Sequence, residues 1–479
     1  LMVKKNILLL YPDCPSSYGD PRNPPIGIGI IGTILQKKGF NVKIWDLRLD
    51  SYTLNKLKDF IDGFKPIFIG ISTTSIGFKS TVEICKMVKN HFPHIVTIVG
   101  GPHPSSYPER TLKNKEIDFI CMGEGESIIV EFAENIRESQ KLKAISGIGY
   151  SKSGRMILTP KRDFIKDIDS LPFPDYKLYP LDSYRLKGGS LVLPLLTSRG
   201  CPYNCTFCCS YKIQGKKYRM RSSINVVDEI ERNLVEYGSS EFLVVDDTFN
   251  LDKRRVIKIC DEIKKRNLKI KWSCGQGIRA DQSDYEIFRA MKGAGCNLVA
   301  IGIETVNPQT LKRIKKGESV DEISNSIKAA QKANLMVKGL FIIGLPGETI
   351  RDALNTVDFF KKTGIDLPRY SMMVIYPGTE MCEWMKENVS NYTDPYEYII
   401  NHTELENAGV QYETAEFSKE EKLRAWEIVN KEAEVWYIKK KLVKFMGVYC
   451  AKLVYHVFKL DSLRKIARWA YQRKFVKLN

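Results

Sequence analysis

The sequence predicts an α/β protein with two successive parallel-sheet units and a helical region after them. Short apolar runs alternate with helical patterns from residue 6 to 150, and six more apolar runs alternate with helices from 190 to 394. This alternation is typical of parallel strands covered by helices. After residue 394 the strand pattern stops. We therefore expect domains at 1–150, 190–394 and 395–479, with a linker interrupted by prolines at 151–189.

The first unit is predicted to be a doubly wound parallel sheet. Its expected strands cover residues 7–11, 42–46, 67–72, 96–100 and 119–122, with helices at 28–38, 54–63, 79–92 and 127–139. Ligands of such sheets bind outside the carboxyl ends of the strands. The run Gly27-Ile-Gly-Ile-Ile-Gly32 fits a dinucleotide-binding pattern, but in that pattern the first glycine directly follows the first strand, and here a loop at 12–25 intervenes. The glycines instead predict a smooth helix face against which a large group can lie.

The second unit is predicted to be a partial (β/α) barrel of six strands. These are expected at residues 191–196, 242–245, 271–275, 298–303, 337–343 and 370–375. The active site of such a barrel is built from the loops at the carboxyl ends of its strands. The first strand leads directly into Thr-Ser-Arg-Gly-Cys-Pro-Tyr-Asn-Cys-Thr-Phe-Cys-Cys at 197–209. The cysteines of this loop are therefore expected in the active site.

Three of these cysteines, Cys201, Cys205 and Cys208, stand in C-x-x-x-C-x-x-C spacing, with the aromatic Phe207 before the last one. Three thiolates so close together can each bind a different iron of a [4Fe–4S] cube and leave the fourth iron open for chemistry. A structural zinc site usually takes two C-x-x-C pairs, and only Cys205 and Cys208 form one. Disulfides suit secreted chains, and nothing marks this chain as secreted. Chance clustering among 12 cysteines would not explain the flanking residues.

At these residues the chain resembles the radical S-adenosylmethionine (SAM) superfamily. The resemblance implies that the three cysteines hold the cluster and that SAM chelates the open iron. Electron transfer from the cluster would cleave SAM to a 5′-deoxyadenosyl radical, and a flavodoxin- or ferredoxin-type partner would supply the electron.

The same resemblance implies contacts to SAM at the ends of the barrel strands. These are Phe207, Asp246, Asp247, Arg279, Glu304, Ile343 and Gly344. Asp246 and Asp247 suit the SAM ammonium, which needs an anionic or carbonyl acceptor. Glu304 and Arg279 suit the ribose hydroxyls and the carboxylate, and the backbone at 343–344 suits the adenine. The alternatives are ordinary helix starts, with Asp247 as a cap and Glu348 with Thr349 before the next helix.

The whole first unit resembles the cobalamin-binding domain that precedes many radical SAM domains. The matching segments are Asn23-Pro-Pro-Ile-Gly-Ile-Gly, Gly70-Ile-Ser-Thr-Thr, Gly100-Gly-Pro-His-Pro and Gly123-Glu-Gly-Glu. The resemblance implies these contacts to cobalamin: Pro25, Gly27, Gly29, Ser72, Thr73, Thr74, Ser75, Gly100, Gly101, His103, Gly123 and Glu124. Together the two resemblances imply a doubly wound parallel-sheet cobalamin-binding domain, a partial (β/α) barrel radical SAM domain and a C-terminal helical region.

One departure from the cobalamin-binding pattern matters. The D-x-H-x-x-G motif, whose histidine ligates cobalt from below, is absent between residues 11 and 25. The resemblance then implies cobalamin held without a histidine ligand, its lower face against the loop at 72–75. His103 is the only histidine at a predicted strand end, and the simpler interpretation makes it a loop residue next to prolines.

Composition predicts an ordinary soluble chain, with 43% hydrophobic and 27% charged residues. The apolar run at 7–10 is too short for the apolar region of a signal peptide. No uninterrupted apolar run reaches the roughly 18 residues of a spanning helix. We therefore expect a cytoplasmic protein, in which an exposed iron–sulfur cluster also survives best.

The formal charge of +18 is concentrated near the C-terminal end. Residues 431–479 carry thirteen Lys and Arg against three acidic residues, a net +10. A capping box at Ser418-Lys-Glu-Glu421 predicts a helix to about residue 446, interrupted at Gly447 and resumed over 448–460. Lysines at 441, 444, 452 and 459 share one stripe, and aromatic residues are plentiful: Trp436, Tyr437, Phe445, Tyr449, Tyr455, Phe458, Trp469 and Tyr471. This pattern favours peripheral binding to the anionic inner face of a membrane. The alternative is that the helices pack on the barrel and cover its open side.

These inferences predict a cobalamin-dependent radical SAM enzyme, most simply a methyltransferase that acts on an unactivated carbon of an apolar, lipid-like or membrane-associated small molecule. One SAM would restore the methyl group of cobalamin, and a second would yield the radical that removes the substrate hydrogen. One alternative is a radical SAM enzyme that closes a ring or forms a carbon–carbon bond without methyl transfer. The other is a basic RNA-binding protein with a structural cluster. Because the excess charge lies in the tail and not across the α/β units, no nucleic-acid partner is predicted.

Overall fold

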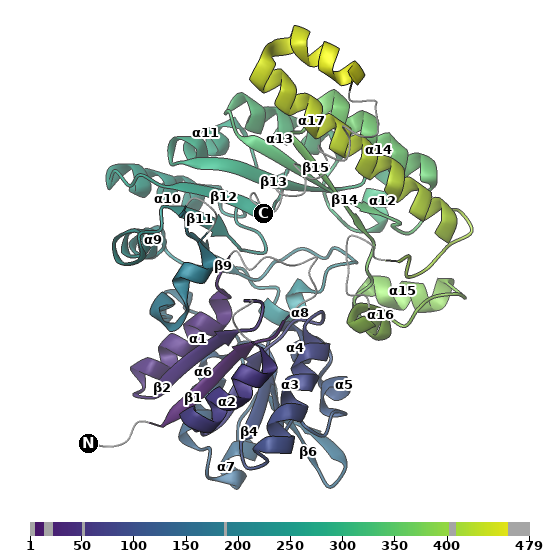
Figure 1. Ribbon diagram of the computed structural model, residues 1–479. Coiled ribbons are helices and arrows are strands. Elements are labelled where there is room, and N and C mark those ends of the chain that lie inside the picture. Colours follow the sequence, from purple (N-terminus) through teal and green to yellow (C-terminus); the bar gives the residue numbers. More distant parts are fainter. Residues whose placement is uncertain (1–4, 14–22, 50–52, 186–188, 402–408, 458–479) are drawn as a thin grey trace.

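The computed structural model describes residues 5–13, 23–49, 53–185, 189–401 and 409–457, with 442–457 described by their backbone only. Two sheets form the two halves of the molecule, the first below and the second above in Figure 1, and the long C-terminal helix lies along the second.

The first sheet has seven strands in the order β2-β1-β3-β4-β5-β6-β7, of which β1 to β5 are parallel. These five are β1 (Asn6–Tyr11), β2 (Asn41–Asp46), β3 (Phe68–Ser72), β4 (Val96–Gly100) and β5 (Phe119–Cys121). The helices are α1 (Ile26–Lys37), α2 (Leu54–Phe64), α3 (Phe78–His91), α4 (Pro102–Ser106), α5 (Pro108–Leu112), α6 (Gly125–Glu134) and α7 (Ser139–Ala144). In β1, Ile7 and Leu9 share a core with residues of α1 and α6, whereas Leu8 and Leu10 share one with residues of α2 and α3. Both faces are covered, which explains the uninterrupted apolar strand and confirms the doubly wound sheet.

A hairpin extends the first sheet beyond the expected domain limit at residue 150. Strand β6 (Ile148–Lys152) pairs antiparallel with β5 and with β7 (Arg155–Leu158). Ser153 and Gly154 form its turn with φ values of 50° and 77°, the positive values that a two-residue hairpin loop requires. The linker therefore starts after residue 158. It crosses to the second sheet through three short 3-10 helices, Ile168–Ser170, Tyr176–Leu178 and Leu181–Tyr184.

The second sheet is parallel and has six strands in the order β15-β14-β13-β12-β11-β8. The strands are β8 (Val192–Leu195), β11 (Glu241–Val244), β12 (Lys271–Ile278), β13 (Cys296–Glu304), β14 (Met336–Ile343) and β15 (Leu367–Met372). The helices are α8 (Ser210–Gln214), α9 (Ser223–Tyr237), α10 (Lys253–Lys265), α11 (Tyr285–Gly293), α12 (Pro308–Arg313), α13 (Val320–Lys332) and α14 (Ile350–Thr363). Because β8 and β15 are edge strands, the barrel is open, as predicted. A ribbon of β9 (Ser198–Arg199) and β10 (Arg219–Met220) lies with α8 between the two sheets (Figure 1).

Within the described residues, three helices follow the barrel: α15 (Glu380–Asn388), α16 (Pro395–Asn401) and α17 (Lys419–Val457). The predicted capping box forms at the start of α17, where Ser418 Oγ accepts a hydrogen bond from the Glu421 N–H (3.3 Å) and Glu421 Oε2 accepts one from the Ser418 N–H (2.9 Å). The helix continues through Gly447, so the predicted interruption there is wrong. A single glycine costs only about 1 kcal/mol in a helix, which neighbouring turns outweigh.

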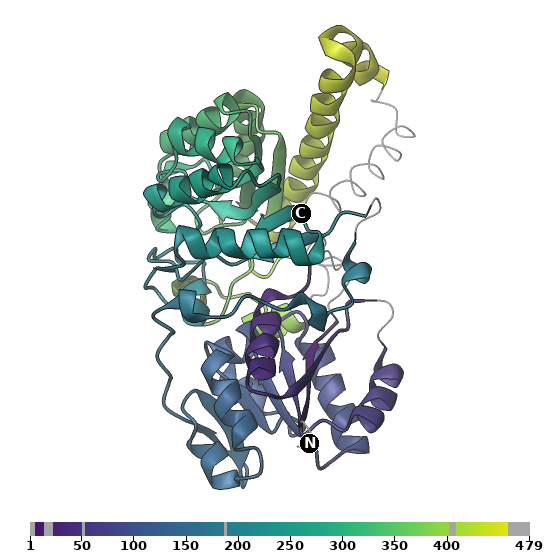
Figure 2. The same ribbon diagram turned by 90° about the vertical axis from the view of Figure 1, so that its left-hand side faces the viewer.

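The first part of α17 packs against the barrel, and the end of its described backbone extends past it (Figure 2). Trp436 Nε1 donates a hydrogen bond to the Ile365 carbonyl oxygen (2.7 Å), and Tyr437 is buried with Leu298 and Leu367. Lys440 Nζ donates to the Gly364 carbonyl oxygen (2.7 Å). The alternative prediction, that the C-terminal helices pack on the barrel, is therefore correct for this stretch. Further along the chain, from Phe445 onward, are the other aromatic residues predicted to contact a membrane. Their side chains are not among those that the structure describes. No helix within the described residues is long and apolar enough to cross a membrane.

Candidate active site

The cysteine loop leaves the carboxyl end of β8 through a turn that only glycine fits. Gly200 has a φ of 84°, and a Cβ atom there would lie 2.4 Å from the Lys217 carbonyl oxygen. The turn carries the chain into Cys201, Cys205 and Cys208, which are partly exposed and close enough to interact electrostatically. The Cys208 N–H donates a hydrogen bond to the Cys205 carbonyl oxygen (3.1 Å). The three predicted cluster ligands thus share one loop at the barrel edge.

The spacing of these thiols suits a cluster, because a cube takes each thiolate at a different iron. Burial raises the pKa of Cys208 to about 12, so at neutral pH its sulfur becomes a thiolate only when a metal replaces the proton. The donor set and its spacing therefore fit a [4Fe–4S] cluster.

Two neighbouring acids after β11 have different surroundings. Asp246 is buried, and its carboxylate accepts hydrogen bonds from the Thr197 N–H (2.6 Å), Thr197 Oγ1 (2.5 Å) and Ser198 Oγ (2.6 Å). Asp247 is exposed at the same strand end. The expected contact of Asp246 with SAM is therefore not supported, because both of its oxygens hold the start of the cysteine loop. Asp247 stays the candidate for the SAM ammonium.

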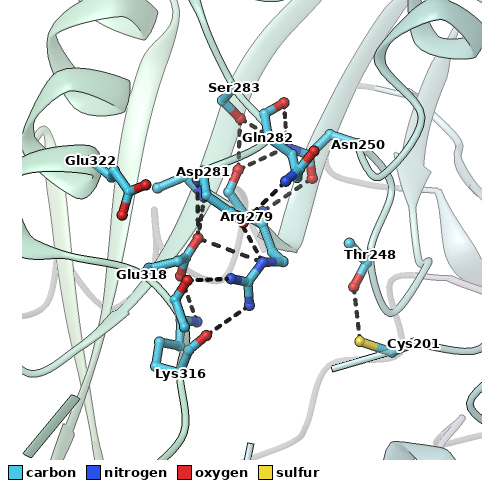
Figure 3. A network of polar contacts seen from close by, with 12 residues as sticks. Cys201, Thr248, Asn250, Arg279, Asp281, Gln282, Ser283, Lys316, Glu318 and Glu322 are labelled. Atoms are coloured by element: carbon cyan, nitrogen blue, oxygen red, sulfur yellow. Dashed lines mark hydrogen bonds and ion pairs between the residues drawn. The ribbon is translucent and has the colours of Figure 1, made fainter. Parts of the chain in front are cut away.

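Arg279 is held by the protein instead of pointing at a ligand (Figure 3). Its Nε atom donates to Asp281 Oδ1 (2.8 Å) and its Nη1 atom to the Lys316 carbonyl oxygen (3.0 Å). The guanidinium lies 3.5 Å from the ring centroid of Tyr203, between the first two cluster cysteines. Asn250 bonds both backbone groups of Arg279, accepting from its N–H (3.1 Å) and donating to its oxygen (2.8 Å). The expected contact with the SAM carboxylate is replaced by support of the cysteine loop.

Glu304 ends β13 in a strained conformation. It has a φ of 63°, which a residue with a side chain rarely adopts, and the pairing with β14 shifts register there. Its Oε1 atom accepts from Lys316 Nζ (2.9 Å), which also pairs with Glu318 (3.3 Å). Strain of this kind clusters at functional sites. One oxygen takes part in the ion pair, so the other can still accept a ribose hydroxyl, and Glu304 stays a candidate.

The backbone after β14 is occupied by internal hydrogen bonds. The Ile343 carbonyl oxygen accepts from the Met373 N–H (2.8 Å), and the Gly344 N–H donates to Glu348 Oε2 (2.8 Å). The Gly344 oxygen accepts from the Tyr412 hydroxyl. An adenine contact through these groups at Ile343 and Gly344 is therefore not supported. Thr349 does cap α14, whereas Glu348 is fully buried and closes the Gly344 turn.

The N-terminal end of α1 divides into an open part and a covered part. A Cβ atom at Gly27 would meet no described atom within 4 Å, whereas one at Gly29 would lie 3.1 Å from Tyr179 Oη and 3.3 Å from Pro174. The Pro25 carbonyl oxygen accepts a hydrogen bond from Tyr179 (2.7 Å). The linker, and not a ligand, therefore covers Gly29 and the Pro25 carbonyl. Gly27 stays open for cobalamin.

The loop after β3 is held close to the end of β4. Gly101 has a φ of 97°, and a Cβ atom there would lie 2.8 Å from the Thr73 carbonyl oxygen, while the Thr73 N–H donates to the Gly100 oxygen (2.9 Å). Thr73 is fully buried, so its side chain cannot meet a ligand as predicted. The residues on this loop that stay partly exposed are Ser72, Thr74 and Ser75.

His103 lies on helix α4. The prediction that it is a loop residue is therefore wrong. It is fully buried, stacked on Phe78 with ring centroids 3.8 Å apart, and its Nδ1 atom lies 3.0 Å from Ser75 Oγ. Burial lowers its pKa to about 3, so the ring is neutral. It supports the 72–75 loop from behind, and direct contact with cobalamin is not supported.

The segment after β5 ends in a carboxylate that points to the barrel. Glu124 accepts from Arg199 Nη1 (2.7 Å) and Arg219 Nη1 (2.8 Å) and is buried between the two halves. Its predicted contact with cobalamin is therefore not supported. Gly123, by contrast, has a φ of 80°, and among the described atoms a Cβ there would meet only the Phe164 ring, at 4.0 Å. Gly123, Gly27 and the hydroxyl residues after β3 are all small or polar, which suits the approach of a large flat group.

Sequence reasoning missed the charged partners at the site. Lys316 and Glu318 lie in the turn between α12 and α13. They were missed because site residues were sought at the predicted strand ends. Arg199 stands inside the cysteine loop and could have been chosen by position alone.

Two family models and several known proteins match the chain. Residues 195–360 match the family described as the radical SAM superfamily, and residues 20–133 match the B12 binding domain. An uncharacterized methyltransferase of Pyrococcus horikoshii is 34% identical over 366 residues, which cover 76% of this chain and 79% of that protein. The cytidylyl-2-hydroxyethylphosphonate methyltransferase of Streptomyces wedmorensis is 27% identical over 456 residues, 83% of this chain and 84% of that one.

A solved structure shares the fold over nearly the whole chain. It is a cobalamin-dependent S-adenosylmethionine radical enzyme with aqua-cobalamin bound, and it superimposes with a TM-score of 0.73 at 20% identity, covering 97% of this chain and 72% of that one. The chain is thus a radical SAM enzyme with a [4Fe–4S] cluster, SAM and cobalamin as its cofactors. It belongs to the radical SAM superfamily, as a member in which a B12-binding domain precedes the radical SAM domain.

Proposed function

We propose that the chain is a methyltransferase that transfers a methyl group to an unactivated carbon of a small molecule. The observation that carries the proposal is the joining of the two strand edges: Glu124, at the edge expected to bind cobalamin, contacts Arg199, two residues before Cys201. When bound, the cluster with SAM supplies a carbon radical and cobalamin supplies the methyl group. A substrate between the two edges would meet both.

The residues of the chain have separate tasks in this proposal. Cys201, Cys205 and Cys208 hold the cluster beside Phe207, Asp247 accepts the SAM ammonium, and Glu304 accepts a ribose hydroxyl. Asp246 and Arg279 keep the loop in place through buried hydrogen bonds. The buried contact of Glu124 with Arg199 holds the two halves together, and exclusion of water between them would protect a carbon radical. A flavodoxin- or ferredoxin-type protein would deliver the electron.

The test uses SAM with a deuterated methyl group. The reconstituted enzyme is incubated under anaerobic conditions with that SAM, a reductant and a small-molecule extract of cells that lack the gene. Methyl transfer predicts a product in which one CD3 group replaces one hydrogen. A product that has only lost hydrogen, or has formed a ring or a carbon–carbon bond without the label, contradicts methyl transfer and supports the alternative radical reaction.

We further propose that the substrate is apolar and that the enzyme, otherwise cytoplasmic, meets it at an anionic membrane surface. Support comes from the net charge of +10 in residues 431–479, since basic residues near such a surface contribute about 1 kcal/mol each. The packing of Trp436 and Tyr437 on the barrel limits this role to the residues after them.

Sedimentation with vesicles tests this second proposal. Binding should require anionic lipid, weaken with salt and disappear when residues 442–479 are removed from a protein that still binds SAM. Equal binding to neutral vesicles, or no binding, would contradict it.

A further inference from the structure

Four charged side chains form a buried contact between the two halves of the molecule. We call this set, Glu124, Glu126, Arg199 and Arg219, the interdomain clamp. Glu124 accepts from Arg199 (2.7 Å) and from Arg219 (2.8 Å), and Glu126 Oε1 accepts from Arg199 Nη2 (2.5 Å). The negative charges of the two carboxylates and the positive charges of the two guanidiniums cancel.

The clamp is shielded from water, unlike the ion pairs that Arg110 of the first domain makes with the C-terminal part. Its side chains are 4–8% exposed, whereas Arg110 and Asp394, which link α5 to the segment before α16, are 40% and 45% exposed. Exposed pairs contribute little, but removing one partner of a buried pair leaves an uncompensated charge. The clamp therefore allows few relative positions of the two halves.

Each end of the clamp leads directly to one cofactor edge. Glu124 precedes α6 and follows Gly123 at the open edge after β5. Arg199 faces Arg219 across the β9–β10 ribbon and stands two residues before Cys201. At most two residues of chain separate either end from its edge, so a shift of one edge should move the other.

The linker is bonded into the same contact. The Ile165 N–H donates to Glu124 Oε2 (2.7 Å), and the Ile165 carbonyl oxygen accepts from Arg219 Nη1 (2.7 Å). The neighbouring Phe164 ring lies 5.0 Å from the Arg219 guanidinium and fills the space against Gly215. Three segments that are far apart in the sequence thus meet at Glu124.

We propose that Glu124 is a positioning residue which, through Arg199 and Arg219, fixes the separation and orientation of cobalamin relative to the cluster. The inference rests on the proposed function, because only a reaction that uses both cofactors together needs that separation fixed. A misplacement of about 1 Å can cost about 100-fold in rate.

The test compares Glu124→Gln with Glu131→Gln. Both changes remove one carboxylate near α6, but Glu131 pairs with Arg162 and is 46% exposed, outside the clamp. Each protein is loaded with cluster and cobalamin and reduced, and the spin–spin interaction between cob(II)alamin and the reduced cluster is measured by electron paramagnetic resonance. We expect an altered or broadened interaction in Glu124→Gln and the wild-type interaction in Glu131→Gln. The ratio of S-adenosylhomocysteine to 5′-deoxyadenosine should fall about 10- to 100-fold in Glu124→Gln alone.

The possible outcomes separate this inference from the proposed function. A wild-type spin–spin interaction in fully loaded Glu124→Gln overturns the inference. If that variant does not retain both cofactors, Glu126→Gln, which removes a single clamp contact, is measured by the same criteria. Wild-type protein that shows the spin–spin interaction but forms no S-adenosylhomocysteine contradicts methyl transfer and leaves the positioning role intact.

Discussion

The two strand edges that meet in this protein are built from opposite kinds of residues. At the barrel edge, charged side chains are mostly held by other protein groups: Asp246 holds the cysteine loop, and Arg279 holds Asp281 and Tyr203. At the first sheet the residues are small, and a Cβ atom at Gly27 would meet no described atom within 4 Å.

The difference teaches where ligand contacts should be sought. A carboxylate or guanidinium at a strand end needs partners once it is buried, and the nearest ones are protein groups. A flat ligand needs room, which only small residues provide. Charged motifs at the barrel edge therefore report how the site is held, and small residues at the first sheet report where a ligand lies.

The largest effect is expected at the cysteine loop. Cys208→Ala should lose the cluster and with it all cleavage of SAM, because a cube needs three thiolates from this loop. Cys209→Ala is the matched control, since Cys209 caps helix α8 and lies outside the C-x-x-x-C-x-x-C set. Iron content and 5′-deoxyadenosine formation after anaerobic reconstitution measure both. SAM cleavage in Cys208→Ala, or its loss in Cys209→Ala, would refute the ligand assignment.

A second comparison separates the neighbouring acids after β11. Asp246→Asn should destabilise the protein by about 1–3 kcal/mol, because an amide cannot accept all the hydrogen bonds that the buried carboxylate accepts. Asp247→Asn should leave stability within about 0.5 kcal/mol and weaken SAM binding about tenfold or more, since a bond to a charged group is lost. Denaturant unfolding and SAM titration measure the two effects. If the two variants changed stability and SAM binding equally, the two acids would not have the separate roles assigned to them.

A third comparison uses two glycines of α1. Gly27→Leu should keep the unfolding temperature and reduce cobalamin retention, because its side chain fills the open edge. Gly29→Leu should instead destabilise the apoprotein by about 1–3 kcal/mol, because its side chain would meet Tyr179 and Pro174. Thermal unfolding without cobalamin and the bound cobalamin content distinguish them. Full cobalamin retention in Gly27→Leu would place the ligand elsewhere.

The smallest effect is expected at His103. Because its ring is fully buried between Phe78 and the 72–75 loop, we expect no nitrogen splitting in the electron paramagnetic resonance spectrum of bound cob(II)alamin. The spectrum of His103→Phe should be unchanged. A splitting in the wild type that vanishes in the variant would show histidine on the cobalt.

The sequence predicted the two parallel sheets well, because apolar runs and helical patterns are local signals. The β6–β7 hairpin was missed, although Ser153-Gly154 is a turn signal, since the strand after it has only four residues and is mostly exposed. The cluster cysteines could be predicted because their spacing along one loop was the only information required. The role of Glu124 depends on Arg199, which lies 75 residues away in the sequence. A local sequence pattern cannot relate residues so far apart.

The most direct test of the account is one assay of the two products of SAM. The enzyme, loaded with cluster and cobalamin, is incubated with SAM and a reductant, and S-adenosylhomocysteine and 5′-deoxyadenosine are measured in the same sample by mass spectrometry. The account predicts both nucleosides, with S-adenosylhomocysteine lost when cobalamin is left out. Formation of 5′-deoxyadenosine alone from protein that holds cobalamin would contradict a joint methyl-transfer site at the two edges.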